Sequence, residues 1–193
     1  AISFLEGKST ANDLMEQNLA QIQDHIEARL DDLLNLPGRI QQVNANLIRE
    51  GWLDLQNLRS WRRTLFEQVQ TFNGLSSIIW GGADGRSVGI ARDPGGIGYE
   101  FTIKDKETGD KRHEFFCDAN GEMKKEPDVL VVYDPRNRPW YKAAIEADKS
   151  TWTAPYKRAD TISSDNKLAL GYAKPIRDRQ GKIIGVLNAE LTP

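Results

Sequence analysis

The sequence predicts an α+β fold, in which a long N-terminal helix precedes an antiparallel sheet with flanking helices. Apolar residues recur in the N-terminal part at steps of three and four, as on one face of an amphipathic helix. From residue 75 onward, short runs of β-branched and aromatic residues replace that pattern and indicate strands. Turn dipeptides such as Asp84-Gly85 and Asn120-Gly121 separate these runs, which favours antiparallel pairing. The apolar helix positions are Leu19, Ile22, Ile26, Leu30 and Leu33.

The first helix is expected over residues 9–36, and Pro37-Gly38 should kink or interrupt it because proline removes a backbone donor. Helical character resumes beyond that point. We therefore assign residues 1–50 to a long N-terminal helix, kinked near residue 37, and residues 51–193 to the module that follows. Two shorter helices are expected over residues 55–72 and 139–148.

The strand pattern is interrupted by glycine-containing turns. The run Gly81-Gly82-Ala83-Asp84-Gly85 resembles a phosphate-binding loop only in its glycine count, and it reads as a hairpin turn. The last strand lies close to the end of the chain, so we expect a single sheet-containing module, with a second module reduced or absent. The expected strands are residues 75–80, 87–92, 98–104, 112–117, 129–133, 167–176 and 182–191.

Composition excludes several classes of function. The formal net charge is −2 over 193 residues and the basic residues are scattered, so we expect no nucleic-acid partner. No segment approaches the roughly eighteen consecutive apolar residues of a membrane span. The two histidines, His25 and His113, and the single cysteine, Cys117, lack metal-ligand spacing, and no nucleotide-binding or nucleophile motif occurs. We therefore expect neither an enzyme nor a cofactor.

The densest cluster of binding chemistry lies between Tyr133 and Tyr141, in the run YDPRNRPWY. Each proline pushes the residue before it toward extended geometry, so Asp134 and Arg138 should be extended and a helix can begin at Pro139. A planar guanidinium beside aromatic rings suits a small ligand that carries a carboxylate. The alternative is a structural corner in which Arg138 pairs with Asp134 and the aromatic rings are core.

This run resembles the DPRxRPWY signature of the double Cache family, the extracytoplasmic sensor domains of bacterial membrane receptors. Three later runs resemble the family in the same order; they are Trp152–Tyr156, Ala173–Ile176 and Gly181–Val186. The resemblance implies a PAS-like antiparallel sheet that binds a small ligand. It also implies a position between two transmembrane helices, and thus a periplasmic part of an inner-membrane protein.

The resemblance implies a set of ligand-binding residues and one departure from the family pattern. Arg158 stands where the amino-acid-binding branch has an acid, and Asp160 lies nearby but out of register. A cation there would repel a ligand ammonium group, so we expect a carboxylate, with an amino acid as the close alternative. Arg158 is otherwise a solvated loop charge, and Glu190 a surface residue at a strand end. The candidate ligand residues are Tyr133, Arg138, Trp140, Tyr141, Tyr156, Arg158, Asp160 and Glu190.

Other aromatic and basic residues are expected to be structural: Trp52, Trp61 and Trp80 as packing residues and Arg92 as a surface cation. We interpret the chain as a sensor domain that passes a ligand-induced shift across a membrane. The alternative is a soluble regulatory or protein-interaction domain that dimerises through its long helix. In either case the apolar helix face could form a homodimer.

Overall fold

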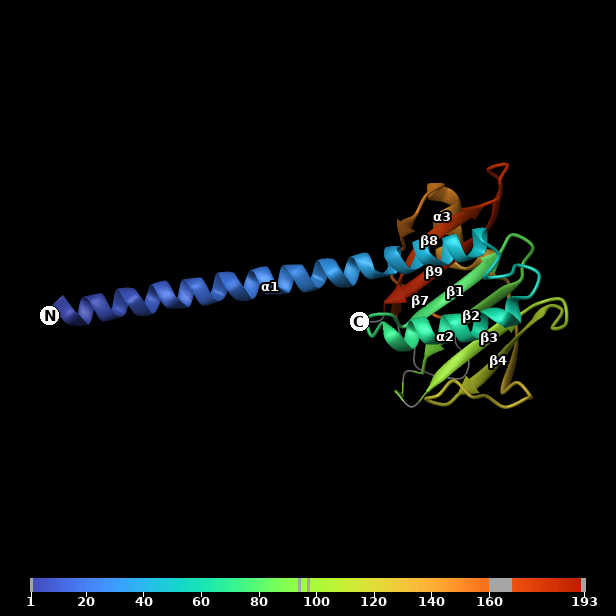
Figure 1. Cartoon of the computed structure of the whole chain (residues 1–193), viewed down its shortest axis with the longest axis horizontal. Coiled ribbons are helices and arrows are strands. Elements are labelled where there is room, and N and C mark those ends of the chain that lie inside the picture. Colours follow the sequence, from blue (N-terminus) through green and yellow to red (C-terminus); the bar gives the residue numbers. More distant parts are fainter. Residues whose placement is uncertain (1, 94, 97, 160–167, 192–193) are drawn as a thin grey trace. The chain divides into compact units, whose positions relative to one another are not determined.

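A computed structural model describes the backbone of residues 2–93, 95–96, 98–159 and 168–191, with side chains from residue 14 onward within those ranges. It confirms the predicted class, a long helix followed by an antiparallel sheet with few flanking helices (Figure 1). The helices are α1 (Ile2–Arg49), α2 (Trp61–Thr71) and α3 (Pro139–Ala147), with short 3-10 turns at Leu58–Ser60 and Pro135–Asn137. The strands are β1 (Ser77–Gly82), β2 (Ser87–Arg92), β3 (Tyr99–Lys104), β4 (Lys111–Cys117), β5 (Val129–Val132), β6 (Thr151–Trp152), β7 (Tyr156–Lys157), β8 (Leu168–Arg177) and β9 (Ile183–Leu191).

Nine strands of the described residues form one antiparallel sheet in the order β5-β4-β3-β2-β1-β9-β8-β6, with β7 pairing to β8 off this path. The hairpin prediction at Asp84-Gly85 is confirmed, since Gly85 takes a φ of +85° in the turn that joins β1 to β2. The last strand of the chain, β9, pairs with β1 and therefore lies near the centre of the sheet. Among the described strands, only β6 and β7 were not predicted from the sequence, because two residues are too few to show an alternating pattern.

The chain divides into two compact units, residues 1–36 and 37–193. The second unit contains the sheet and begins at Pro37. The helix α1 runs through Pro37 without interruption, so the expected break is absent there, while the expected kink stays a prediction. Residues 37–49, which the sequence assigned to the helical domain, pack within the second unit, where Ile40, Gln41 and Ile48 are buried. None of the described helices combines the length and apolar character needed to cross a membrane.

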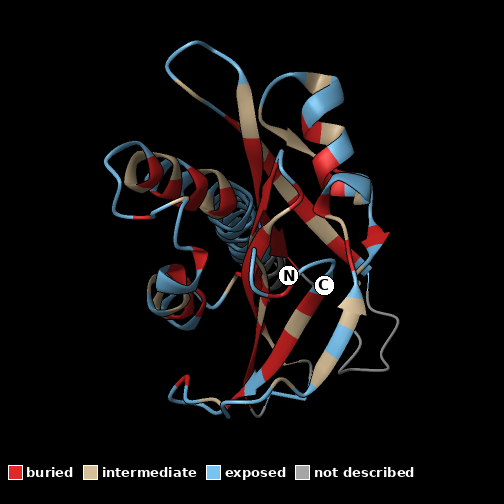
Figure 2. Cartoon of the chain, turned by 90° about the vertical axis from the view of Figure 1, so that its right-hand side faces the viewer, coloured by how far each residue is buried: buried red, intermediate tan, exposed pale blue. Residues whose placement is uncertain are grey.

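One face of the sheet is apolar and covered by helices; we call it the apolar face. Trp61 of α2 packs against Trp80 of β1 with ring centroids 5.8 Å apart, and Phe66 meets Tyr99 edge to face. The last turns of α1 join α2 through a reciprocal amide pair between Asn44 and Gln68, at 2.9 and 2.8 Å. Figure 2 shows helices on both sides of the sheet and buried residues along its central strands.

The predicted helix over residues 55–72 begins later than expected, because Asp54 organises a turn before it. The Asp54 carboxylate accepts from the Gln56 backbone N–H at 2.8 Å, and its carbonyl accepts from Asn57. The predicted corner at residues 134–139 is confirmed: Asp134 and Arg138 are extended and α3 begins at Pro139. Asp134 binds Arg136 rather than Arg138, with a contact of 2.7 Å, which leaves Arg138 available to other partners.

Candidate functional site

The face of the sheet opposite α2 carries buried charged and polar side chains, and we call it the polar face. The strand registers place Glu190 directly beside Ser77, and Asn188 one alternate position further along β9. Burying such groups is costly unless each finds a partner, so a face of this composition must hold an organised network. The buried polar residues of this face are Ser77, Ser87, Glu100, Arg112, Glu114, Asn188 and Glu190.

Glu190 lies at the centre of this network and is only 2% exposed. Its Oε2 accepts from the Ser77 hydroxyl at 2.6 Å and lies 3.4 Å from Nε of Arg158. Its Oε1 accepts from the Tyr156 hydroxyl and, at 3.2 Å, from the Asn188 amide. The carboxylate thus has four partners, which together offset the cost of burying a charge.

The hydroxyl of Tyr156 connects Glu190 with Asn188, which donates to it at 3.0 Å. Burial, followed by the nearby Glu190 charge, raises the pKa of Tyr156 well above its ordinary value, so this hydroxyl stays protonated and donates. Gly171 on the neighbouring strand makes room for the pair, because a Cβ there would lie 2.5 Å from Asn188 Oδ1. That Oδ1 atom is buried and has no hydrogen-bond partner in the part of the chain that the structure describes.

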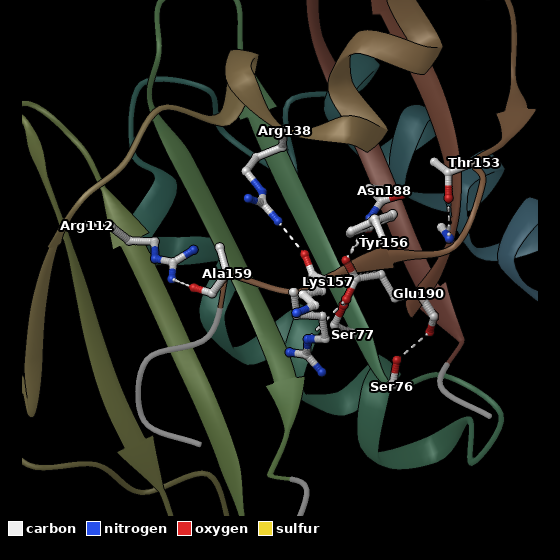
Figure 3. A network of polar contacts seen from close by, with 12 residues as sticks. Ser76, Ser77, Arg112, Arg138, Thr153, Tyr156, Lys157, Ala159, Asn188 and Glu190 are labelled. Atoms are coloured by element: carbon white, nitrogen blue, oxygen red, sulfur yellow. Dashed lines mark hydrogen bonds and ion pairs between the residues drawn. The ribbon is translucent and has the colours of Figure 1, made fainter. Parts of the chain in front are cut away.

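The segment Tyr156–Ala159 crosses the polar face, and we call it the strap (Figure 3). Arg138 donates from Nη2 to the Lys157 carbonyl at 2.8 Å. Arg112 donates from Nη2 to the Ala159 carbonyl at 2.5 Å. Together with the contacts of Tyr156 and Arg158 to Glu190, these bonds hold the strap at four consecutive residues. The guanidinium groups of Arg112, Arg138 and Arg158 therefore all lie at the strap.

Tyr133, at the end of β5, belongs to the same network. The Arg112 guanidinium stacks on its ring at 4.1 Å from the centroid, and Arg112 Nε also donates to Glu114 at 2.9 Å. Burial raises the pKa of Tyr133, although the charges of Arg112 and Arg138 oppose the shift. Tyr133 thus joins the network through the ring face that Arg112 covers.

Trp140 and Tyr141 do not enter the polar network but form its apolar border. Both are buried on α3 in a core cluster that also contains Tyr156, Ala173 and Val186. The Trp140 ring lies over Gly81, where a Cβ would approach it to 2.7 Å. Tyr156 is the residue shared between the apolar cluster and the polar network, so it joins the two parts of the site.

Three interpretations from the sequence were wrong. Arg158 is not a solvated loop charge, since its side chain is 9% exposed and pairs with Glu190, and Glu190 is not a surface residue. Trp52 is not a packing residue, because it is 79% exposed. Arg92 is more than a surface cation: its Nε donates to the Leu75 carbonyl at 3.0 Å. Asp160 lies outside the described residues.

The packing roles expected for Trp61 and Trp80 are confirmed, since both side chains are buried.

Sequence reasoning missed Arg112, Glu114, Asn188 and Ser77. The signal was present, because Arg112 and Glu114 alternate with His113 and Phe115 along β4. The same alternation, however, is typical of a strand whose polar face meets water. In the folded structure the strap covers this face instead, as the hydrogen bond from Arg112 to the Ala159 carbonyl shows.

The arrangement can bind a small polar molecule but offers no metal centre, as no group of potential ligands occurs among the described residues. It combines a PAS-like sheet, a long N-terminal helix and a strap that covers a buried polar face. This is the architecture of Cache-type sensor domains. The ligand-binding domain of the Campylobacter jejuni chemoreceptor Tlp3 in complex with L-valine has this fold, with a TM-score of 0.51 at 18% identity over 86% of this chain and 54% of that chain.

The chain belongs to the methyl-accepting chemotaxis protein-like family, first PDC sensor domain, whose model matches residues 91–192. It is 40% identical to McpA of Pseudomonas putida over 77 residues, which are 38% of this chain and 11% of McpA. It is 28% identical to PscA of Pseudomonas syringae pv. tomato over 152 residues, which are 78% of this chain and 22% of PscA. Both relatives are methyl-accepting chemotaxis proteins, and the chain spans only a small part of their length.

Proposed function

We propose that this sensor domain is the extracytoplasmic part of a transmembrane chemoreceptor and binds a small organic carboxylate between the strap and the polar face. The observation that carries the proposal is the network around Glu190. It joins Tyr156 and Arg158 of the strap to the central strands of the sheet. A ligand that enters this network must change the contacts between the strap and β9, and its binding energy is thereby linked to a shift of both.

The carboxylate preference rests on the balance of charge at the strap. Arg158 lies beside Glu190 and neutralises the acid that would otherwise attract a ligand ammonium group. Arg138 projects from the corner before α3 and can offer a planar fork to a carboxylate. Tyr133 and Tyr156 add hydroxyl groups on either side. Trp140 and Tyr141 supply an apolar border for the body of the ligand.

An amino acid is the second candidate ligand. Tlp3, which shares the fold, binds L-valine, and an amino acid needs an acceptor for its ammonium group. Asn188 Oδ1 is such an acceptor, since it is buried and lacks a partner among the described residues. The Arg158 guanidinium, which lies beside Glu190, would repel that ammonium group and so cost affinity.

The route from the site to the long helix runs through β9. With its amide oxygen turned toward the sheet, Gln41 of α1 accepts from the backbone N–H groups of Ala189 at 2.7 Å and Asn188 at 3.0 Å. Asn188 and Glu190 carry the site on the same strand. A ligand-induced shift of β9 therefore acts directly on α1, the element that would continue toward the membrane.

The homodimer is the remaining part of the proposal. Leu19, Ile22, Ile26, Leu30 and Leu33 are 39–59% exposed on α1. Such an apolar face is stabilised by pairing with the same helix of a second copy. Ile26→Glu should suppress dimerisation in sedimentation velocity runs while ligand affinity is retained. Dimers of unchanged stability in this variant would remove the helix from the interface.

A thermal-shift screen of carboxylates, amino acids and amines tests the ligand class. A ligand at one hundred times its Kd stabilises the domain by about 2.7 kcal/mol, which is readily detected. Calorimetry then compares the wild type with Arg138→Ala, which should lose about 2–5 kcal/mol of binding free energy, and with Arg138→Lys, which should not rescue it. Arg136→Ala is the matched control, because Arg136 binds Asp134 outside the strap. A response to amines alone would overturn the carboxylate proposal.

A further inference from the structure

A hollow lies on the other side of the sheet from the strap. Its volume is about 410 Å³ and it opens between the last turns of α1 and the end of β8. Lys174 of β8 stands opposite Leu187 in the strand register, on the same face as Trp80 and away from Asn188 and Glu190. The lining residues are Ala45, Ile48, Arg49, Leu55, Lys174, Pro175, Ile176, Arg177, Asp178, Arg179 and Ile184.

The floor of this hollow is apolar. Ile48 and Ile176 are buried, and Leu55, Pro175 and Ile184 are half-buried around them. These side chains come from three separate parts of the chain: α1, the loop before α2, and the β8–β9 hairpin. A concave apolar floor of this size, about 300–1,000 Å³ in typical ligand sites, accepts the hydrocarbon body of a small molecule.

The rim is cationic, with Arg49, Lys174, Arg177 and Arg179 against a single acid, Asp178. The acid is already engaged, since its Oδ1 accepts from the backbone N–H groups of Gln180 at 3.0 Å and Lys182 at 2.9 Å in the hairpin turn. Asp178 therefore neutralises the four cations of the rim only in part.

Two of the four cations have partners: Arg177 binds Asp148 and the Gly181 carbonyl, and Arg49 binds Glu50. The side chains of Lys174 and Arg179, by contrast, make no hydrogen bond or ion pair within the described ranges of the chain. Lys174 is also half-buried, so its ammonium group gains most from an anion placed over the apolar floor.

We propose that this hollow is a second ligand site, for a small monocarboxylate with an apolar aliphatic or aromatic body. The carboxylate binds Lys174 and Arg179, and the hydrocarbon body covers Ile48 and Ile176. The site is independent of the ligand proposed beneath the strap, because the two lie on opposite faces of the sheet. A molecule bound here contacts both α1 and β8, so it stabilises the packing of the helix on the sheet.

The test is a titration of the chain with hexanoate, benzoate and acetate, followed by amide chemical shifts and by calorimetry. Hexanoate and benzoate should shift the amides of Ile48, Lys174 and Ile176 and should bind at least about ten-fold more tightly than acetate, because only they cover the floor. Lys174→Gln should weaken hexanoate binding by about ten-fold or more. Lys182→Gln is the matched control, since Lys182 lines the adjacent hollow of about 420 Å³ instead.

Each result decides the proposal. Shifts confined to the amides around Tyr156 and Glu190 would assign hexanoate to the strap site and overturn it. So would equal affinity for acetate, equal losses in Lys174→Gln and Lys182→Gln, or no shift at millimolar concentration. Hexanoate binding that persists in Arg138→Ala would separate this site from the one beneath the strap, even if the proposed function there failed.

Discussion

Both faces of the sheet are buried, but one is buried mainly by apolar side chains and the other largely by a network of polar and charged side chains. The apolar face is covered by α2 and the last turns of α1 through large side chains such as Trp61, Leu65 and Ile78, which are fully buried. On the polar face, the strap is held by hydrogen bonds and ion pairs that meet at Glu190, while α3 covers the neighbouring apolar border. Apolar contacts are non-directional and add up over area, whereas a polar network stabilises only when every member has its partner. The first face therefore suits stability and the second suits recognition.

The largest effect is expected on the apolar face. Trp61→Ala should lower the free energy of unfolding by about 3–5 kcal/mol, because the ring is fully buried against Trp80 and leaves a cavity. Urea denaturation measures the change. Trp52→Ala is the matched control, since Trp52 is exposed and should shift stability by about 0.5 kcal/mol or less. Similar losses in both variants would contradict the division between core and surface.

On the polar face, Glu190→Gln should cost about 3 kcal/mol of stability, because it leaves the buried Arg158 guanidinium without its acid. A second change, Arg158→Gln, should restore part of the loss. The double-mutant cycle should then give a coupling of about 1–3 kcal/mol. Strict additivity of the two losses in urea denaturation would show that the pair does not hold the strap.

The two faces also differ in how they respond to alkali. Burial raises the pKa of Cys117, behind the apolar face, from 9.0 to about 11, although Arg62 opposes the shift. The folded protein therefore keeps a proton that the unfolded chain has lost, so stability falls as the pH rises from about 9 to about 11, by about 2–3 kcal/mol. Cys117→Ala should reduce that slope when unfolding is measured across the range. The tyrosines of the polar face contribute a separate loss at higher pH that the variant retains.

The smallest effect is expected at the contact between Gln41 of α1 and the backbone of β9. Gln41→Leu should cost about 1–2 kcal/mol, since it removes the side-chain hydrogen bonds that join α1 to the backbone N–H groups of Asn188 and Ala189 in β9. Ligand affinity beneath the strap should change little. The ligand-induced change in hydrogen exchange along residues 38–48 should, however, disappear. Asn44→Leu serves as the comparison, because Asn44 joins α1 to α2 and not to β9.

The sequence predicted most of the fold because its signals are local. Helical periodicity, strand alternation and turn dipeptides placed all but the shortest strands, and the two prolines of the run from Tyr133 to Tyr141 set the extended geometry of Asp134 and Arg138. Local signals were weaker at the boundaries. Because Asp54 forms a turn, α2 begins later than predicted. The helix α1 continues through Pro37, because packing of the helical turns that follow Pro37 compensates for the one hydrogen bond that proline removes.

The candidate site was predictable only in part. Arg138, Tyr156 and Glu190 were proposed as ligand residues from a resemblance to the family, whereas Arg112 and Asn188 were not proposed at all. A charged residue at every second position of a strand gives the same sequence pattern whether its side chain faces water or a buried network. Its surroundings depend on which segment crosses the strand, and here that segment lies some forty to fifty residues away along the chain, as with Arg112 and Ala159.

The sequence by itself determined the class of fold, the order of its elements and the corner that presents Arg138, because proline geometry and side-chain periodicity act over a few residues. Only the tertiary structure decided that Arg158 and Glu190 are buried partners and that Trp52 is exposed. It also decided that three arginines meet at the strap. Burial and ion pairing depend on contacts between distant segments, and the low dielectric that makes those contacts strong exists only once the chain has folded.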